Sequence, residues 1–133
     1  MNLADFFKRW DASTSLPITD FNGIWRNELD SEMEISVGKH GRVTGVYRSA
    51  EADENCRGEH ELVGFTNENM ITFSVDFEHN HILTSWTGHF VNESGVDEIK
   101  TLWHLVKSVQ EHDLPLEAWG SVYTGSNLFK RVH

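Results

Sequence analysis

Polar side chains occur in this sequence on strand faces that should be buried. Residues 23–31, GIWRNELDS, alternate strictly, and three of the four residues on one face are charged, which marks that face as the solvent side. The opposite face should therefore be buried, yet it carries the amide of Asn27 and the hydroxyl of Ser31. A buried polar group without a hydrogen-bond partner costs about 1–3 kcal/mol, so each of these groups requires a partner.

The same inward parity collects a set of eight amides and hydroxyls along the chain. They are Asn27, Ser31, Tyr47, Ser49, Thr84, Thr101, Ser121 and Asn127. One interpretation is that these groups bond to one another and to trapped water, as buried polar groups routinely do. The other is that they bind a ligand. Such donors and acceptors, enclosed by aromatic walls, suit a compact, neutral, hydrogen-bonding head group better than a fatty tail.

The elements that must position these residues are predicted to be short strands. From residue 23 onward the apolar pattern has a period of two, and tight polar turns interrupt it. The predicted strands cover residues 23–31, 33–37, 43–49, 60–66, 71–78, 82–92, 98–108 and 121–131. Because no helix separates them, parallel βαβ units are excluded. The pattern favours an all-β, eight-stranded antiparallel up-and-down β-barrel over residues 21–133, with a two-sheet sandwich as the alternative.

The predicted interior of this barrel is rich in aromatic side chains. It comprises Trp25, Met33, Ile35, Val43, Ile71, Phe73, Val75, Phe77, Trp86, Phe90, Trp103, Leu105 and Phe129. Residues 1–20 differ, because Leu3, Phe6, Phe7 and Trp10 share one helical face and Asn2 can act as its N-cap. We expect this N-terminal extension to be a short helix. It could cap the closed end of the barrel, pack on a symmetry mate or cover the binding mouth.

Composition excludes several classes of function. A net charge of −10 with only 11 Lys and Arg argues against a nucleic-acid partner. The apolar runs are too short for a membrane span, and the first residues lack a signal-peptide core. Cys56 is alone, so no intrachain disulfide can form. His79 and His81 lie in a predicted turn without a third ligand, so we expect no metal. No nucleophile elbow, P-loop or paired catalytic carboxylate occurs, and we expect no enzyme activity.

Five segments carry a family pattern in order and spacing. They are GIWRNELDS, TGVYRSA, TSWTGHFV, IKTLWHLV and AWGSVYTGSNLF. From about Gly23 to Val132 the chain resembles the avidin and streptavidin family. The resemblance implies noncovalent binding of biotin at the open end of the barrel, without a cofactor. It also favours a secreted protein from which a signal has been removed, acting by sequestration of the vitamin.

The resemblance assigns the polar residues to the ureido end of biotin. By position, Asn27, Ser31 and Tyr47 would bond the ureido oxygen. Ser49 and Asn127 would accept the two ureido N–H groups. A urea oxygen would then be the hydrogen-bond partner that Asn27 and Ser31 require.

The remaining carried-over residues would enclose the ligand. Thr84 would face the thioether sulphur, and Phe77, Trp86 and Trp103 would form aromatic walls. Trp119 matches a tryptophan that the family lends across a subunit interface. A homotetramer is therefore expected first and a dimer second, with Leu102, Val106 and Val122 on the outer face as apolar interface candidates.

Some positions depart from the family pattern. Phe77 stands where the family has tryptophan, and Ile82 where it often has a serine that reaches the biotin carboxylate. Asp53, on the loop over the site, would repel that carboxylate. We therefore expect tight binding that is weaker than the family's best. The alternatives are an oligomeric scaffold of this family that has lost biotin binding, and a calycin-type carrier of another small ligand.

Overall fold

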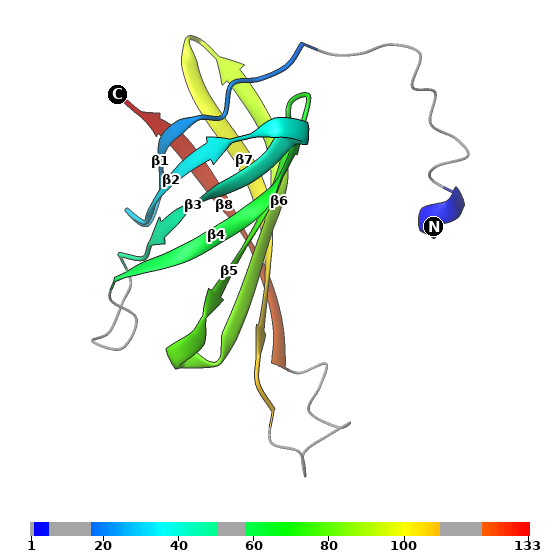
Figure 1. The fold of residues 1–133 in the computed structure, drawn as a ribbon, viewed down its shortest axis with the longest axis vertical. Coiled ribbons are helices and arrows are strands. Elements are labelled where there is room, and N and C mark those ends of the chain that lie inside the picture. Colours follow the sequence, from blue (N-terminus) through cyan, green and yellow to red (C-terminus); the bar gives the residue numbers. More distant parts are fainter. Residues whose placement is uncertain (1, 6–16, 51–57, 110–120) are drawn as a thin grey trace.

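Eight antiparallel strands close into a barrel. The computed structural model describes residues 2–5, 17–50, 58–109 and 121–133 of the 133-residue chain. The strands are β1 (Gly23–Asn27), β2 (Glu32–Val37), β3 (Arg42–Arg48), β4 (Glu59–Asn67), β5 (Met70–Phe77), β6 (Ile82–Glu93), β7 (Val96–Lys107) and β8 (Val122–Val132). Each strand pairs with the next, and β1 pairs with β8 (Figure 1). The predicted barrel is confirmed, and the two-sheet sandwich is excluded.

Short 3-10 turns form two of the connections between the strands. A 3-10 turn, η1 (Lys39–Gly41), joins β2 to β3, and a second, η2 (Glu78–Asn80), joins β5 to β6. His40 and His81 adopt positive φ angles of 60° and 57° in these turns, a conformation that reverses the chain within a few residues. The turn predicted around Gly38 and the hairpin predicted around His79 are therefore both present.

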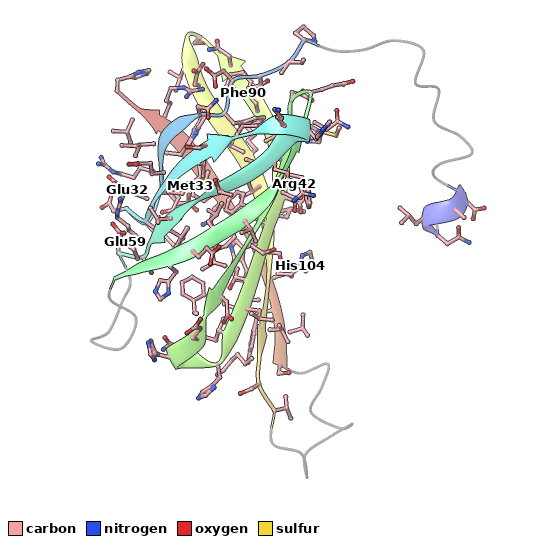
Figure 2. All side chains as sticks on the ribbon, viewed as in Figure 1. Glu32, Met33, Arg42, Glu59, Phe90 and His104 are labelled. Atoms are coloured by element: carbon pink, nitrogen blue, oxygen red, sulfur yellow. The ribbon has the colours of Figure 1, made fainter. Side chains whose placement is uncertain are left out.

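Alternation along the strands sorts the side chains into a buried and a solvent-facing set. Neighbours on β2 illustrate it, since Met33 is fully buried while Glu32 lies on the outer side of the barrel wall (Figure 2). The structure adds Phe21, Leu62 and Ile99 to the predicted interior, each with at most 1% of its surface exposed. Phe21 precedes β1, where no strand period could signal its burial.

One end of the barrel is filled by aromatic rings. Phe90 meets Phe21 and Trp25 edge-on, at centroid distances of 6.2 and 6.4 Å. The Trp25 indole N–H donates to the Phe21 carbonyl at 3.0 Å. The Arg131 guanidinium lies 4.2 Å from the centroid of the Trp25 ring. Among the described residues, this end is therefore packed with protein, which leaves the opposite end of the barrel for a ligand.

Arg131 also ties together three segments at the packed end. Its Nε donates to Asp97 Oδ2 at 2.8 Å, and its two terminal nitrogens donate to the carbonyls of Asn22 and Asp20 at 2.9 and 2.7 Å. The segment that leads into β1 is thus fixed to β7 and β8 by a charged, multidentate contact.

The N-terminal extension is described only in part. Residues 3–5 form one helical turn, in which the Asp5 N–H donates to Asn2 Oδ1, as expected of an Asn2 N-cap. Phe6, Phe7 and Trp10 lie outside the described residues. Across the described part of the chain, no helix is long and apolar enough to cross a membrane.

Candidate ligand-binding site

A cavity of about 260 Å³ lies inside the barrel, at the end opposite the aromatic packing. Its lining comprises Asn27, Leu29, Ser31, Tyr47, Ser49, Phe77, Ile82, Thr84, Trp86, Trp103, Leu105 and Asn127. Every predicted site residue that the structure describes is in this set. Asp53 and Trp119 lie outside the described residues, so their roles stay predictions. The volume is near the lower end of the roughly 300–1,000 Å³ typical of small-molecule sites, which suits a compact ligand.

The first polar edge of the cavity is built by the turn between β1 and β2. Strand β1 ends at Asn27 rather than at Ser31 as predicted, because Asn27 Oδ1 accepts hydrogen bonds from the N–H groups of Leu29 and Ser31, both at 3.0 Å. Ser31 Oγ in turn accepts the Ala50 N–H at 3.0 Å. Asn27 and Ser31 remain 95% or more buried. Their acceptor oxygens thus hold the backbone, and their N–H and O–H donors are the groups that can serve a ligand.

The second polar edge is Asn127 on β8. Its Oδ1 accepts the Trp86 indole N–H at 2.9 Å, and its Nδ2 donates to Glu28 Oε1 at 2.8 Å. Its backbone carbonyl accepts the Thr101 hydroxyl at 3.0 Å. For Thr101, therefore, the interpretation that inward polar groups bond to the protein itself is correct.

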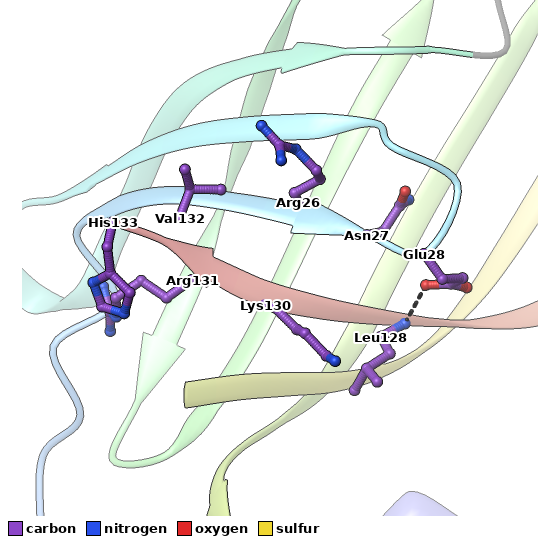
Figure 3. A pocket seen from close by; sticks show the side chains of 8 residues that line it. All are labelled: Arg26, Asn27, Glu28, Leu128, Lys130, Arg131, Val132 and His133. Atoms are coloured by element: carbon purple, nitrogen blue, oxygen red, sulfur yellow. Dashed lines mark hydrogen bonds between the residues drawn. The ribbon is translucent and has the colours of Figure 1, made fainter. Parts of the chain in front are cut away.

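Glu28 is exposed, as the parity of residues 23–31 predicts, but the strand expected to continue through residue 31 ends before it. Because β1 ends one residue earlier, Glu28 lies in the turn, and its carboxylate reaches β8. Its second oxygen, Oε2, accepts the Leu128 N–H at 2.8 Å (Figure 3). Strand parity assigns Glu28 to the solvent side correctly, but it gives no signal of the hydrogen bonds that the carboxylate accepts from β8.

Aromatic rings form the cavity walls and hold each other in place. Trp86 stacks on Phe73 at a centroid distance of 5.0 Å and an interplanar angle of 15°. Tyr47 lies 5.1 Å from Trp86 and meets Phe77 edge-on at 5.9 Å. Trp103 pairs with Trp86 across the β6–β7 ladder. These contacts restrict the rings to one arrangement before a ligand arrives.

Thr84 presents a buried hydroxyl to the cavity. The residue is 4% exposed, and within the described part of the chain its Oγ1 has no hydrogen-bond partner. Burying a hydroxyl without a hydrogen-bond partner costs free energy. The geometry therefore favours a polar or polarizable group of a ligand, or a water, next to Thr84 Oγ1.

Apolar side chains are exposed on the outer surface of strands β4 to β8. They include Val63, Phe65, Met70, Leu83, Leu102, Val106 and Val122, with 39–62% of their surface exposed. Leu102, Val106 and Val122, the three predicted from sequence, are among them. A contiguous set of exposed apolar side chains commonly marks an interaction surface.

Comparison with known proteins gives a consistent result. The model of the avidin family matches residues 16–132. The chain is 31% identical to avidin of Gallus gallus over 119 residues, which cover 83% of the chain and 76% of that protein. It is also 31% identical to avidin-related protein 4/5 of the same organism over 125 residues, with the same coverage. Among solved structures, xenavidin superposes with a TM-score of 0.76 at 29% identity, covering 86% of this chain and 99% of that one. Apo shwanavidin superposes with a TM-score of 0.69 at 25% identity, covering 84% and 100%.

Proposed function

The chain belongs to the avidin family, and from this premise we propose that it binds biotin noncovalently in the cavity at the open end of its barrel. Family membership supports a binding protein rather than an enzyme. The cavity supports a small ligand with a polar head, because polar groups line it beside aromatic walls.

The observation that carries the proposal is the division of hydrogen-bonding roles in Asn27 and Ser31. Their oxygens already accept backbone N–H groups, so both side chains offer the cavity donors. Tyr47, whose hydroxyl can also donate, lines the same cavity. Three donors that border one small cavity suit a single carbonyl oxygen, and a urea supplies such an oxygen with N–H groups on both sides.

The remaining polar groups fit the rest of the ligand. Ser49 and Asn127 offer acceptors for the two ureido N–H groups, and Thr84 has an unpartnered hydroxyl for the thioether. Phe77, a smaller ring than tryptophan, forms part of the wall.

The carboxylate end of biotin is held less well in this proposal. Ile82 contributes only an apolar side chain to the cavity, and the charge of Asp53 would oppose a carboxylate. We therefore expect tight binding that is weaker than the best of the family.

The apolar outer face supports a homo-oligomer, with a tetramer favoured over a dimer. The exposed side chains on β6 to β8, such as Leu83 and Leu102, would be buried between subunits. In a tetramer Trp119 would complete a neighbouring site. Native mass spectrometry measures the number of subunits directly.

Biotin titration tests the proposal. We expect tryptophan fluorescence to saturate at one biotin per chain and the melting temperature to rise. Asn27→Asp is the sharpest variant, because it keeps the acceptor oxygen for Leu29 and Ser31 but replaces the donor with a charged acceptor. Affinity should fall at least about 100-fold, since a neutral N–H donor that faces the ureido oxygen is replaced by a charged oxygen that repels it. Asn67→Ala, at the exposed end of β4, is the matched control and should bind as the wild type does. Absence of binding at micromolar biotin would exclude this function.

A further inference from the structure

Glu28 links the β1–β2 turn to β8 through both of its carboxylate oxygens. Oε1 accepts a hydrogen bond from Asn127 Nδ2 at 2.8 Å. Oε2 accepts one from the Leu128 N–H, also at 2.8 Å (Figure 3). Partial burial acts to raise the pKa of the Glu28 carboxyl, but the hydrogen bonds from Asn127, from its own backbone N–H and from Leu128 outweigh it, so the pKa lies below its ordinary value of 4.5. The group is therefore a carboxylate at neutral pH.

Hydrogen bonds link Trp86, Asn127, Glu28 and Leu128 in that order, and the residues at both ends of this chain are donors. The Trp86 indole can only donate, so Asn127 must turn Oδ1 toward it and Nδ2 toward Glu28. The Leu128 backbone N–H also can only donate. Residue 28 must therefore accept two hydrogen bonds, one at each side-chain oxygen. An ionised carboxylate satisfies this condition, whereas a glutamine or a protonated acid does not.

This chain determines what Asn127 offers to the cavity. With its amide fixed, the second lone pair of Oδ1 is available as an acceptor, and the charge of Glu28 polarises the amide toward greater negative charge on that oxygen. We infer that Glu28 is a positioning residue for the ligand: from outside the cavity it holds Asn127 as a strong hydrogen-bond acceptor, and so it selects a ligand that presents an N–H at this point. The inference rests on the proposed function, in which a ureido N–H of biotin is that donor.

Two single substitutions break the chain, and their combination rebuilds it. Glu28→Gln leaves one acceptor oxygen for two donors. Asn127→Asp sets a carboxylate oxygen against the Glu28 carboxylate. In the double variant, the introduced amide nitrogen can donate to the introduced aspartate, the introduced amide oxygen can accept from Leu128, and the aspartate can accept from Trp86. Every donor again faces an acceptor.

The test compares biotin dissociation rates of the wild type, both single variants and the double variant. Each single variant should release biotin about 10- to 100-fold faster, the range expected when a charge-assisted hydrogen bond is lost. The double variant should return to within about tenfold of the wild type, well short of the product of the single effects. Glu34→Gln, an acid on the exposed face of β2, is the control for charge loss and should leave the rate unchanged. Equal rates in Glu28→Gln and Glu34→Gln, or a double variant that multiplies the two losses, would overturn the inference.

A second measurement needs no ligand. The Trp86 indole N–H resonance, assigned with a Trp86→Phe variant, reports its hydrogen bond to Asn127. It should shift upfield in Glu28→Gln and stay in place in Glu34→Gln. If the wild type fails to bind biotin, the proposed function fails while this resonance still decides whether Glu28 orients Asn127. If biotin binds but the resonance does not move, only the role of Glu28 is rejected.

Discussion

Gly125 should be required for the position of the Trp103 wall. The two residues are directly paired across β7 and β8, so their side chains lie on the same face of the sheet. A Cβ added at Gly125 would lie 2.3 Å from Trp103 Cζ2 and 2.6 Å from its Cε2. Ordinary contact begins at 3.4 Å. In Gly125→Ala the indole must therefore move by about 1 Å, into the space that the ligand would occupy.

Gly125→Ala should weaken biotin binding more than it lowers the free energy of unfolding. Because the cavity is open beside the ring, the indole can move without displacing packed backbone, and we expect the free energy of unfolding to fall by no more than about 1 kcal/mol. Filling the site then requires pushing the ring back, and an overpacking cost of about 1–3 kcal/mol corresponds to roughly 5- to 150-fold weaker biotin binding.

Calorimetry of biotin binding and thermal unfolding measure the two effects separately. Gly38→Ala is the control, because its φ of −99° suits alanine and its added Cβ would have 3.8 Å to the nearest atom. It should bind biotin normally and be unchanged or slightly more stable. Unchanged biotin affinity in Gly125→Ala would refute the argument that the Trp103 indole packs directly against this glycine.

Two further predictions concern the packed end of the barrel. Arg131→Lys leaves one nitrogen for three acceptors, so the free energy of unfolding from thermal melts should fall by about 1–3 kcal/mol. Arg42→Lys, at an exposed position, is the control, and its free energy of unfolding should stay within about 0.5 kcal/mol of the wild type. The hydrogen bond from Arg131 lowers the pKa of Asp97 below 3.8. The resulting contribution to stability is complete above that pH and is lost as the pH falls through the lowered pKa. Acid should therefore reduce the melting temperature of the wild type more steeply than that of Asp97→Asn.

The barrel and most of the cavity lining could be predicted because both follow from a period of two. Once strands alternate, the burial of Trp25 requires that of Asn27 on β1, and the burial of Trp86 requires that of Thr84 on β6. The segment motifs added the ligand class, which alternation alone left open between a bound molecule and trapped water.

The contacts that alternation missed occur where strands end. Glu28 follows β1 by one residue, and its bond to Asn127 joins positions 99 residues apart. Phe21 precedes β1 and is nevertheless 1% exposed. No local pattern encodes such contacts, because they depend on how far a turn carries a side chain after the regular backbone stops.

The amides of Asn27 and Asn127 are fixed by the protein before a ligand arrives, and this bears on affinity. Asn27 Oδ1 is held by two backbone N–H groups, and Asn127 is held on both sides of its amide. The rotamer entropy of these side chains is therefore lost on folding rather than on binding, where it would cost about 0.5–1.5 kcal/mol per side chain. Fixed donors on one side of the cavity and a fixed acceptor on the other match the alternating acceptor and donors of a urea. The same fixation makes the site intolerant, since a side chain that cannot rotate cannot adapt to a ligand with the opposite hydrogen-bond polarity.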